Sequence, residues 1–130
     1  MIVDSSALVA VIKRERDWIL FSQAMDGAAN LYISAASYLE TAIVVDGLRD
    51  PVQSARLDEL LLEMEMAVEP VTAEQARIAR QAYRDYGKGS GHRAGLNFGD
   101  CFSYALARVK REPLLFKGDD FGYTDVRAAS

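Results

Sequence analysis

Short apolar segments alternate with longer helical stretches along the whole chain, and this alternation constrains the fold more than any other feature. The apolar segments are residues 1–3, 31–33, 67–71 and 114–116, and each is bounded by residues typical of turns or helix starts. Short strands that are separated by helices pair in parallel, with the helices packed on the sheet. The sequence therefore predicts an α/β fold with a short, mostly parallel sheet.

The helices between these strands have recognisable starts and stops. Ser34 is a good N-cap for a helix that ends at Gly47, and Pro51 suits the first turn of the next helix. Thr72 and Gln75 have the spacing of a capping box, in which each residue bonds the other's backbone N–H. The predicted helices are those from Ser5 or Ser6 to residue 12, over 17–25, from behind Ser34 to about 46, from Pro51 past residue 60, from behind Thr72 to about 86, and over 98–110.

Length and composition set outer limits on the protein. A chain of 130 residues predicts a single domain over residues 1–130. The sequence has no apolar run long enough to span a membrane and no visible export signal, and its single cysteine, Cys101, cannot form an internal disulfide. These features predict a cytoplasmic protein. The net charge of −4 argues mildly against nucleic-acid binding, although a bound cation would offset part of it.

Acidic residues occur at four places beside small or apolar residues. They are Asp4 after the first strand, Glu40 within a predicted helix, Asp100 in the first turn of another helix, and the pair Asp119–Asp120 after the last strand. Sites in parallel sheets form at the carboxyl ends of strands, so these side chains are expected to meet in one pocket. Clustered carboxylates repel one another, and a hard cation such as Mg²⁺ relieves that repulsion. The pattern therefore favours a metal site.

Each acid except Glu40 also has an ordinary structural interpretation. Asp4 can cap the first helix, Asp100 can offset a helix dipole behind an Asn97 N-cap, and Asp119–Asp120 can form a turn with the glycine before them. Glu40 is harder to explain in this way, because a mid-helix acid on a small, apolar face needs a partner.

Four motifs, taken in order, resemble the PIN-domain ribonucleases, and most of all the VapC toxins of bacterial toxin–antitoxin pairs. The motifs are Ile2-Val3-Asp4-Ser5-Ser6-Ala7-Leu8, the helix of Glu40, Leu96-Asn97-Phe98-Gly99-Asp100-Cys101-Phe102, and Leu114-Leu115-Phe116-Lys117-Gly118-Asp119-Asp120-Phe121. The resemblance covers essentially the whole chain. It implies a three-layer α/β/α PIN-like domain that cleaves RNA internally with Mg²⁺ or Mn²⁺, is usually dimeric, and is inhibited by a small VapB-type antitoxin.

The same resemblance implies a role for particular residues. The catalytic and metal-binding acids are Asp4, Glu40, Asp100 and one of the final pair, with Asp120 preferred to Asp119 because the Asp-Phe step is the more regular part of the motif. Ser6 and Asn97 match polar positions that support the metal site.

Basic and apolar clusters suggest where partners bind. Phosphate contacts are expected from Lys13, Arg14, Lys88 and Arg93, which lie near a helix end and in a glycine-rich loop. An antitoxin helix is expected to bind a groove formed by Val9, Ile12, Trp18 and Phe21, while the face with Leu57, Leu60, Leu61, Met64 and Met66 is expected to pack in the core.

Two other functions remain as alternatives. The chain could be an inactive PIN-like interaction module, or an aspartate-nucleophile phosphatase using Asp4. The phosphatase would need a second acid where Ser6 stands.

Overall fold

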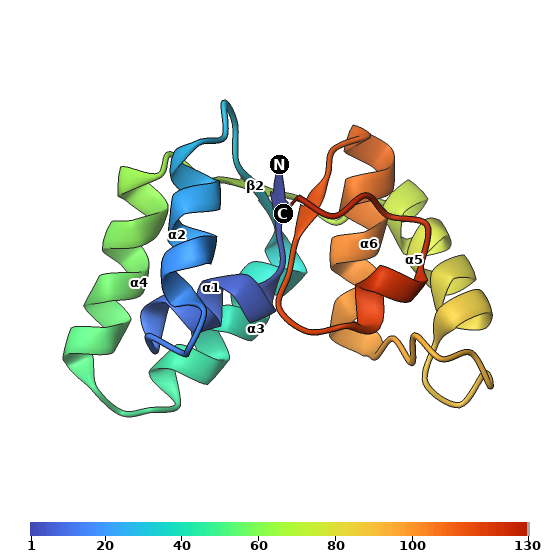
Figure 1. The fold of residues 1–130 in the computed structure, drawn as a ribbon, viewed down its shortest axis with the longest axis horizontal. Coiled ribbons are helices and arrows are strands. Elements are labelled where there is room, and N and C mark those ends of the chain that lie inside the picture. The colour runs from blue at the N-terminus through green and yellow to red at the C-terminus, as the bar shows by residue number, and fades with distance from the viewer. Residues whose placement is uncertain (130) are drawn as a thin grey trace.

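A computed structural model describes residues 1–129 and shows a parallel sheet between two groups of helices (Figure 1). The four strands have the order β3-β2-β1-β4, and each neighbouring pair is parallel. They are β1 (Ile2–Val3), β2 (Tyr32–Ser34), β3 (Ala67–Glu69) and β4 (Leu114–Leu115). This arrangement confirms the predicted α/β/α fold with its short parallel sheet.

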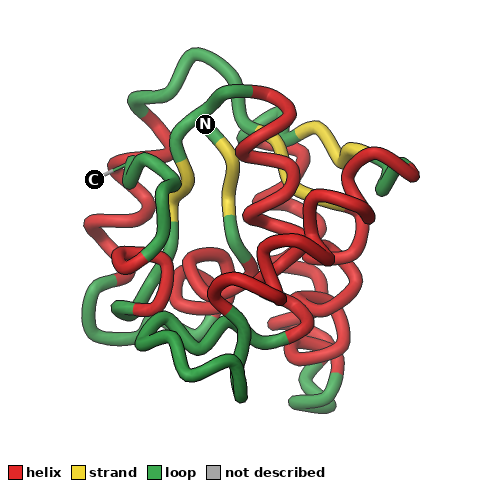
Figure 2. The backbone as a smooth tube through the Cα atoms, turned by 90° about the vertical axis from the view of Figure 1, so that its right-hand side faces the viewer, coloured by secondary structure: helices red, strands yellow, loops and turns green. Residues whose placement is uncertain are grey.

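The helices divide between the two faces of this sheet. In Figure 1, α1 to α4 lie on one side of the strands and α5 and α6 on the other, and Figure 2 shows how short the strands are beside the helices. The helices are α1 (Ser5–Ile12), α2 (Trp18–Asp26), α3 (Ala35–Asp46), α4 (Pro51–Glu63), α5 (Ala73–Tyr86), α6 (Phe98–Lys110) and the 3₁₀ helix η1 (Asp120–Tyr123).

The two-residue period of the strands explains why the sheet has a core on each face. Ile2 and Leu114 are paired across β1 and β4 and belong to the cluster beneath α5 and α6. Val3 and Leu115, the next pair, belong to the cluster beneath α1 to α4. All four side chains are fully buried. Successive strand residues point to opposite faces, so two apolar residues in a row supply both cores.

The observed boundaries agree with the predicted elements within a few residues. Strand β2 begins one residue later than predicted, and β3 ends at Glu69 because Pro70 cannot continue the ladder. The Thr72–Gln75 capping box was wrong in part. The Thr72 hydroxyl accepts the Gln75 N–H at 3.1 Å, but the Gln75 side chain is buried, and its Oε1 has no hydrogen-bond partner within residues 1–129.

The predicted antitoxin groove does not exist as proposed, since two of its four residues are core residues. Ile12 and Phe21 are 1% and 8% exposed and pack in the cluster with α4. The exposed apolar residues of α2 are instead Ile19 and Leu20. The other prediction is confirmed, because the apolar residues on and after α4 pack in or against the same core: Leu57, Leu60, Leu61, Met64 and Met66. No helix within the described residues combines the length and apolar character needed to cross a membrane.

Candidate active site

Asp4 lies at the centre of the site and both of its carboxylate oxygens accept hydrogen bonds. It follows β1 and caps α1, so its Oδ2 accepts the Ser6 N–H at 3.0 Å and the Ser6 hydroxyl at 2.6 Å. Its Oδ1 accepts the Ser103 hydroxyl of α6 at 2.5 Å. Asp4 is only 2% exposed. A buried carboxylate with this many donors is held in one orientation, and the capping interpretation and the site interpretation apply to the same residue.

The Ser6 hydroxyl also ties Asp4 to the end of β4. Ser6 Oγ accepts the backbone N–H of Lys117 at 2.9 Å, while the ammonium of Lys117 binds Glu15 at 2.9 Å. Because one hydroxyl links β1, α1 and the segment after β4, it fixes the start of the loop that carries Asp119 and Asp120.

Glu40 is half-buried and lies against the first turn of α6. The hydroxyl of Ser5 donates to Glu40 Oε1 at 2.5 Å. A Cβ atom added to Gly99 would meet the Glu40 carboxylate, so the glycine makes room for it. The predicted inward orientation of Glu40 therefore depends on the absence of a side chain one position before Asp100.

Asp100 lies in the first turn of α6 within a complete capping box. The Asn97 side chain accepts the Asp100 N–H at 2.8 Å, and Asp100 Oδ2 accepts the Asn97 N–H at 3.0 Å. Burial, with smaller contributions from the negative charges of Asp4, Asp120 and Glu40, raises the pKa of Asp100 to about 6 against the opposing effect of the Asn97 hydrogen bond. Acids from three other parts of the sequence thus lie close enough to Asp100 to disfavour its ionisation.

The final acidic pair follows Gly118, whose φ of +99° is a conformation that favours glycine. Asp120 begins η1, and Asp119 precedes it. Both side chains are exposed. Within the described chain, Asp120 and not Asp119 is among the carboxylates that raise the pKa of Asp100. This difference agrees with the choice of Asp120 as the fourth acid, which stays a prediction.

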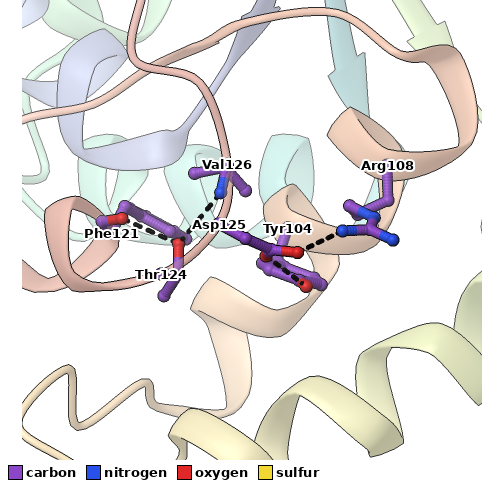
Figure 3. Close-up of polar contacts among 6 residues, drawn as sticks. All are labelled: Tyr104, Arg108, Phe121, Thr124, Asp125 and Val126. Carbon is purple, nitrogen blue, oxygen red and sulfur yellow. Dashed lines mark hydrogen bonds and ion pairs between the residues drawn. The ribbon is translucent and has the colours of Figure 1, made fainter.

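The segment after Asp120 is anchored to α6, as Figure 3 shows. Phe121 is buried, and Asp125 accepts a hydrogen bond from the Tyr104 hydroxyl at 2.6 Å and forms an ion pair with Arg108. The Thr124 hydroxyl closes the turn by donating to the Phe121 carbonyl at 2.7 Å. These contacts hold η1 beside the helix that carries Asp100.

The carboxylates are close enough to influence one another, but they are not arranged as a finished metal site. Among residues 1–129, no group of three or more His, Cys, Asp or Glu side chains has the geometry to hold a metal ion. Glu40 is bonded to Ser5, Asp4 to Ser6 and Ser103, and Asp100 to Asn97. The donor set itself, hard carboxylate oxygens from several elements, suits Mg²⁺ or Mn²⁺.

The four predicted RNA-contacting residues are all exposed. The Arg93 guanidinium lies 4.2 Å from the ring centroid of Tyr123 in η1, which brings the glycine-rich loop to the segment of Asp120. Arg14 lies 4.9 Å from the ring centroid of Trp18, and Lys13 pairs with Glu15 at 3.9 Å. Lys88 lines an apolar pocket of about 570 Å³ between α5 and α6.

Sequence reasoning singled out Ser6 but missed three other serine hydroxyls beside the acids. Ser5 binds Glu40, Ser103 binds Asp4, and Ser37 on α3 binds Ser103. A signal was present in the spacing, because Ser37 precedes Glu40 by three residues and Ser103 follows Asp100 by three. Residues three apart lie on one face of a helix.

Comparison with known proteins places this fold and site in a family. The family model for the PIN domain matches residues 1–126. Ribonuclease VapC28 of Mycobacterium tuberculosis is 59% identical over 129 residues, which cover 99% of this chain and 97% of that protein. The chain therefore belongs to the PIN-domain family, and within that family its relatives are VapC ribonucleases. The resemblance drawn from the four motifs is confirmed.

Solved structures show the same fold. The crystal structure of Mycobacterium tuberculosis VapC20, a sarcin-ricin-loop-cleaving toxin, aligns with a TM-score of 0.73 at 17% identity and covers 96% of this chain and 95% of that one. A toxin–antitoxin complex from Klebsiella pneumoniae aligns with a TM-score of 0.68 at 17% identity, covering 92% of this chain and 88% of that one. At 17% identity, the likeness to these two structures shows a shared fold and carries no conclusion about function.

Proposed function

We propose that this protein is a metal-dependent endoribonuclease that acts as the toxin of a toxin–antitoxin pair. The observation that carries the proposal is the 59% identity to a VapC ribonuclease over nearly the whole chain, and it is supported by the raised pKa of Asp100, which comes from burial and from the charges of Asp4, Asp120 and Glu40. Groups whose pKa is shifted by burial together with nearby charges mark functional sites more often than structural ones.

Asp4, Glu40, Asp100 and Asp120 would hold Mg²⁺ or Mn²⁺. When bound, such an ion supplies an activated water and neutralises charge on the phosphate during phosphodiester hydrolysis. Asp4 would be the fixed ligand, because its orientation is set by Ser6 and Ser103. Within residues 1–129 the Glu40 carboxylate has one hydroxyl partner, Ser5, so Glu40 would join the site at the cost of at most one hydrogen bond. Asp119 is assigned no more than a peripheral role.

The RNA backbone is proposed to pass over the exposed basic residues near this site. Alanine substitutions should weaken RNA affinity and reduce its dependence on salt, since each phosphate contact to a single strand contributes a slope of about 0.7 in log affinity against log salt. An unchanged slope in the quadruple variant would place the RNA elsewhere. The residues to replace are Lys13, Arg14, Lys88 and Arg93.

A second copy of the chain is proposed to cover an apolar face formed by α3 and the start of α6. Leu39, Ile43 and Phe98 are 57%, 63% and 79% exposed. Leu39 and Ile43 are one helical turn apart on α3, and Phe98 precedes Gly99, which packs against Glu40 of the same helix. Large exposed apolar patches mark interaction sites, and a symmetric dimer buries the same patch on both copies.

A VapB-type antitoxin is proposed as the inhibitor. It is expected to act in the cytoplasm, where the RNA substrate and the free thiol of Cys101 both belong. We place the docking surface for the antitoxin at the exposed Ile19 and Leu20 of α2 and no longer at the groove expected from the sequence. An arm with a basic side chain directed at the acids would compete with the metal for the same charge, so basic-to-alanine variants of the antitoxin should bind but inhibit poorly.

The two alternative functions have less support. An aspartate-nucleophile phosphatase would need a second acid two positions after Asp4, and Ser6 stands there. An inactive interaction module would not need Asp4, Glu40 and Asp120 to lie near Asp100, given the cost of their repulsion.

The deciding experiment measures cleavage of an end-labelled single-stranded RNA by EDTA-treated protein, with and without added Mg²⁺ or Mn²⁺. Cleavage should depend on the metal, and Asp4→Asn, Glu40→Gln and Asp100→Asn should each reduce it by about 100-fold or more, because each removes several kcal/mol of metal-assisted stabilisation. Asp26→Asn, which neutralises an exposed acid of α2, is the matched control and should cleave normally. Full activity in EDTA would reject the metal mechanism.

A further inference from the structure

Two serines form a buried layer directly beneath the acids. Ser37 and Ser103 are 1% and 0% exposed, and their hydroxyl oxygens lie 3.1 Å apart between α3 and α6. Ser37 lies one helical turn before Glu40, and Ser103 lies one turn after Asp100. The helices that carry two of the acids are therefore joined by a hydroxyl pair one turn deeper than the acids themselves.

The chemistry of the partners fixes the direction of these hydrogen bonds. An ionised carboxylate only accepts, so Ser103 must donate its proton to Asp4 Oδ1 across the 2.5 Å contact. Ser103 then has only lone pairs left for Ser37, and Ser37 must be the donor in their 3.1 Å contact. The result is a series of hydrogen bonds with one donor direction, from Ser37 on α3 to Ser103 on α6 to Asp4.

This series of hydrogen bonds holds the Asp4 carboxylate in one orientation. Ser6 of α1 holds Oδ2, and Ser103 of α6 holds Oδ1. Each oxygen of a carboxylate has two acceptor positions, so Oδ1 keeps one for a cation while Ser103 occupies the other. A buried ligand that is oriented from both sides does not have to be reordered when the cation binds.

We propose that Ser103, itself oriented by Ser37, is a positioning residue that sets the metal-binding geometry of Asp4. The proposal rests on the metal-dependent function proposed above. It assigns to Ser103 no contact with RNA and no contact with the cation. Its effect is to preorganise Asp4 and to fix the spacing between the helices of Glu40 and Asp100.

The test measures Mn²⁺ affinity of the full chain without RNA, by calorimetry and by the electron paramagnetic resonance signal of free Mn²⁺. Ser103→Ala should weaken Mn²⁺ binding ~10- to 100-fold, as expected for loss of a partner of a metal ligand, while the KM for RNA at saturating metal stays unchanged. Ser37→Ala should have a smaller effect. The double variant should bind like Ser103→Ala alone, because Ser37 acts only through Ser103.

Thr41→Val is the matched control. The Thr41 hydroxyl is equally buried on α3 but donates to the Ser37 carbonyl at 2.8 Å and does not contact Asp4. Thr41→Val should lose thermal stability and keep the Mn²⁺ affinity of the wild type, which separates a positioning effect from general loosening of the core.

Three outcomes would overturn the inference, and they differ from failure of the proposed function. Equal Mn²⁺ affinity in Ser103→Ala and wild type would overturn it, as would additive effects in the double variant or an equal loss in Thr41→Val. If Ser103→Ala does not fold, Ser37→Ala decides the matter, and unchanged affinity there is refuting. A wild-type protein that binds no Mn²⁺ and cleaves no RNA would instead reject the proposed function.

Discussion

Replacing Asp100 by asparagine should abolish metal-dependent cleavage and at the same time stabilise the metal-free protein. Burial and the charges of Asp4, Asp120 and Glu40 raise the pKa of Asp100 from its ordinary value of 3.8 to about 6. At about 1.4 kcal/mol per pKa unit, keeping this group ionised at neutral pH would cost ~3 kcal/mol. Asp100 is only half-buried, and solvent screening reduces the cost to about 1–2 kcal/mol.

Two further effects set the net size of the change. A negative charge in the first turn of α6 is favoured by the helix dipole by ~0.3–1 kcal/mol, and the asparagine variant loses that gain. The capping box survives, because an asparagine oxygen still accepts the Asn97 N–H. We therefore expect a net stabilisation of about 1 kcal/mol, which for a domain of this size raises Tm by ~3–5 °C.

The stability difference between Asp100→Asn and wild type should depend on pH. Between the unfolded pKa of 3.8 and the folded pKa of about 6, the native state holds more of this proton than the unfolded state does. The contribution of Asp100 to stability therefore rises as pH falls from 7 to 4. Urea unfolding in EDTA should show Asp100→Asn more stable than wild type at pH 7–8, with the difference shrinking through pH 6 and vanishing near pH 4.

With metal added, wild type should be more stable than Asp100→Asn. Wild type gains about 2.7 kcal/mol at a metal concentration 100 times Kd, and Asp100→Asn gains less because it has lost a ligand. Glu74→Gln is the matched control, since Glu74 is an exposed acid in the first turn of α5 and its neutralisation should slightly destabilise the protein. A variant Asp100→Asn that is less stable than wild type at pH 8 in EDTA, by an amount independent of pH, would refute the reasoning.

Three other predictions concern the same region. Gly99→Ala should reduce cleavage ~10- to 100-fold, because the added methyl group displaces the carboxylate of Glu40. The Tm should not fall, since alanine favours the helix more than glycine does. Wild-type activity in this variant would contradict the contact between Gly99 and Glu40. Asp120→Asn should impair RNA cleavage more than Asp119→Asn in parallel assays, because of these two residues only Asp120 raises the pKa of Asp100. The reverse order would exchange their assignments. Ile43→Glu should shift the mass measured by light scattering from dimer to monomer, whereas an unchanged mass would remove this face from the interface.

Much of the fold could be predicted because its boundaries depend on local chemistry. Ser34 and Asn97 cap α3 and α6 as expected, and α3 ends before Gly47. The alternation of apolar segments and helices gave the correct parallel sheet because each strand supplies residues to both faces. Errors arose where a side chain had a tertiary alternative, as when Gln75 became buried instead of returning to Thr72.

For the candidate site, the sequence predicted the acids together with Ser6 and Asn97, but not the other hydroxyls beside them. The positions of the acids at strand ends and helix starts follow from sequence order, but the hydroxyls that orient them depend on which helix faces meet. Ser103 contacts Asp4 across 99 positions of the chain, and Ser5 contacts Glu40 across 35. Serine is common at the surface, so only the packing of α6 against β1 and α3 distinguishes these hydroxyls from ordinary ones.

The structural and functional interpretations of the acids turn out to be compatible, and this explains how mutually repelling carboxylates share one place. Asp4 caps α1, Asp100 completes the capping box of α6, and Glu40 lies against the first turn of that same helix. Two helix N-termini thus meet the acids, and each N-terminus favours negative charge by ~0.3–1 kcal/mol while offering backbone N–H donors. This stabilisation offsets only part of the burial and repulsion that together raise the pKa of Asp100, so the folded cluster would still gain from a cation. A site built in this way should bind metal strongly enough to raise stability, and it should remain folded when the metal is removed.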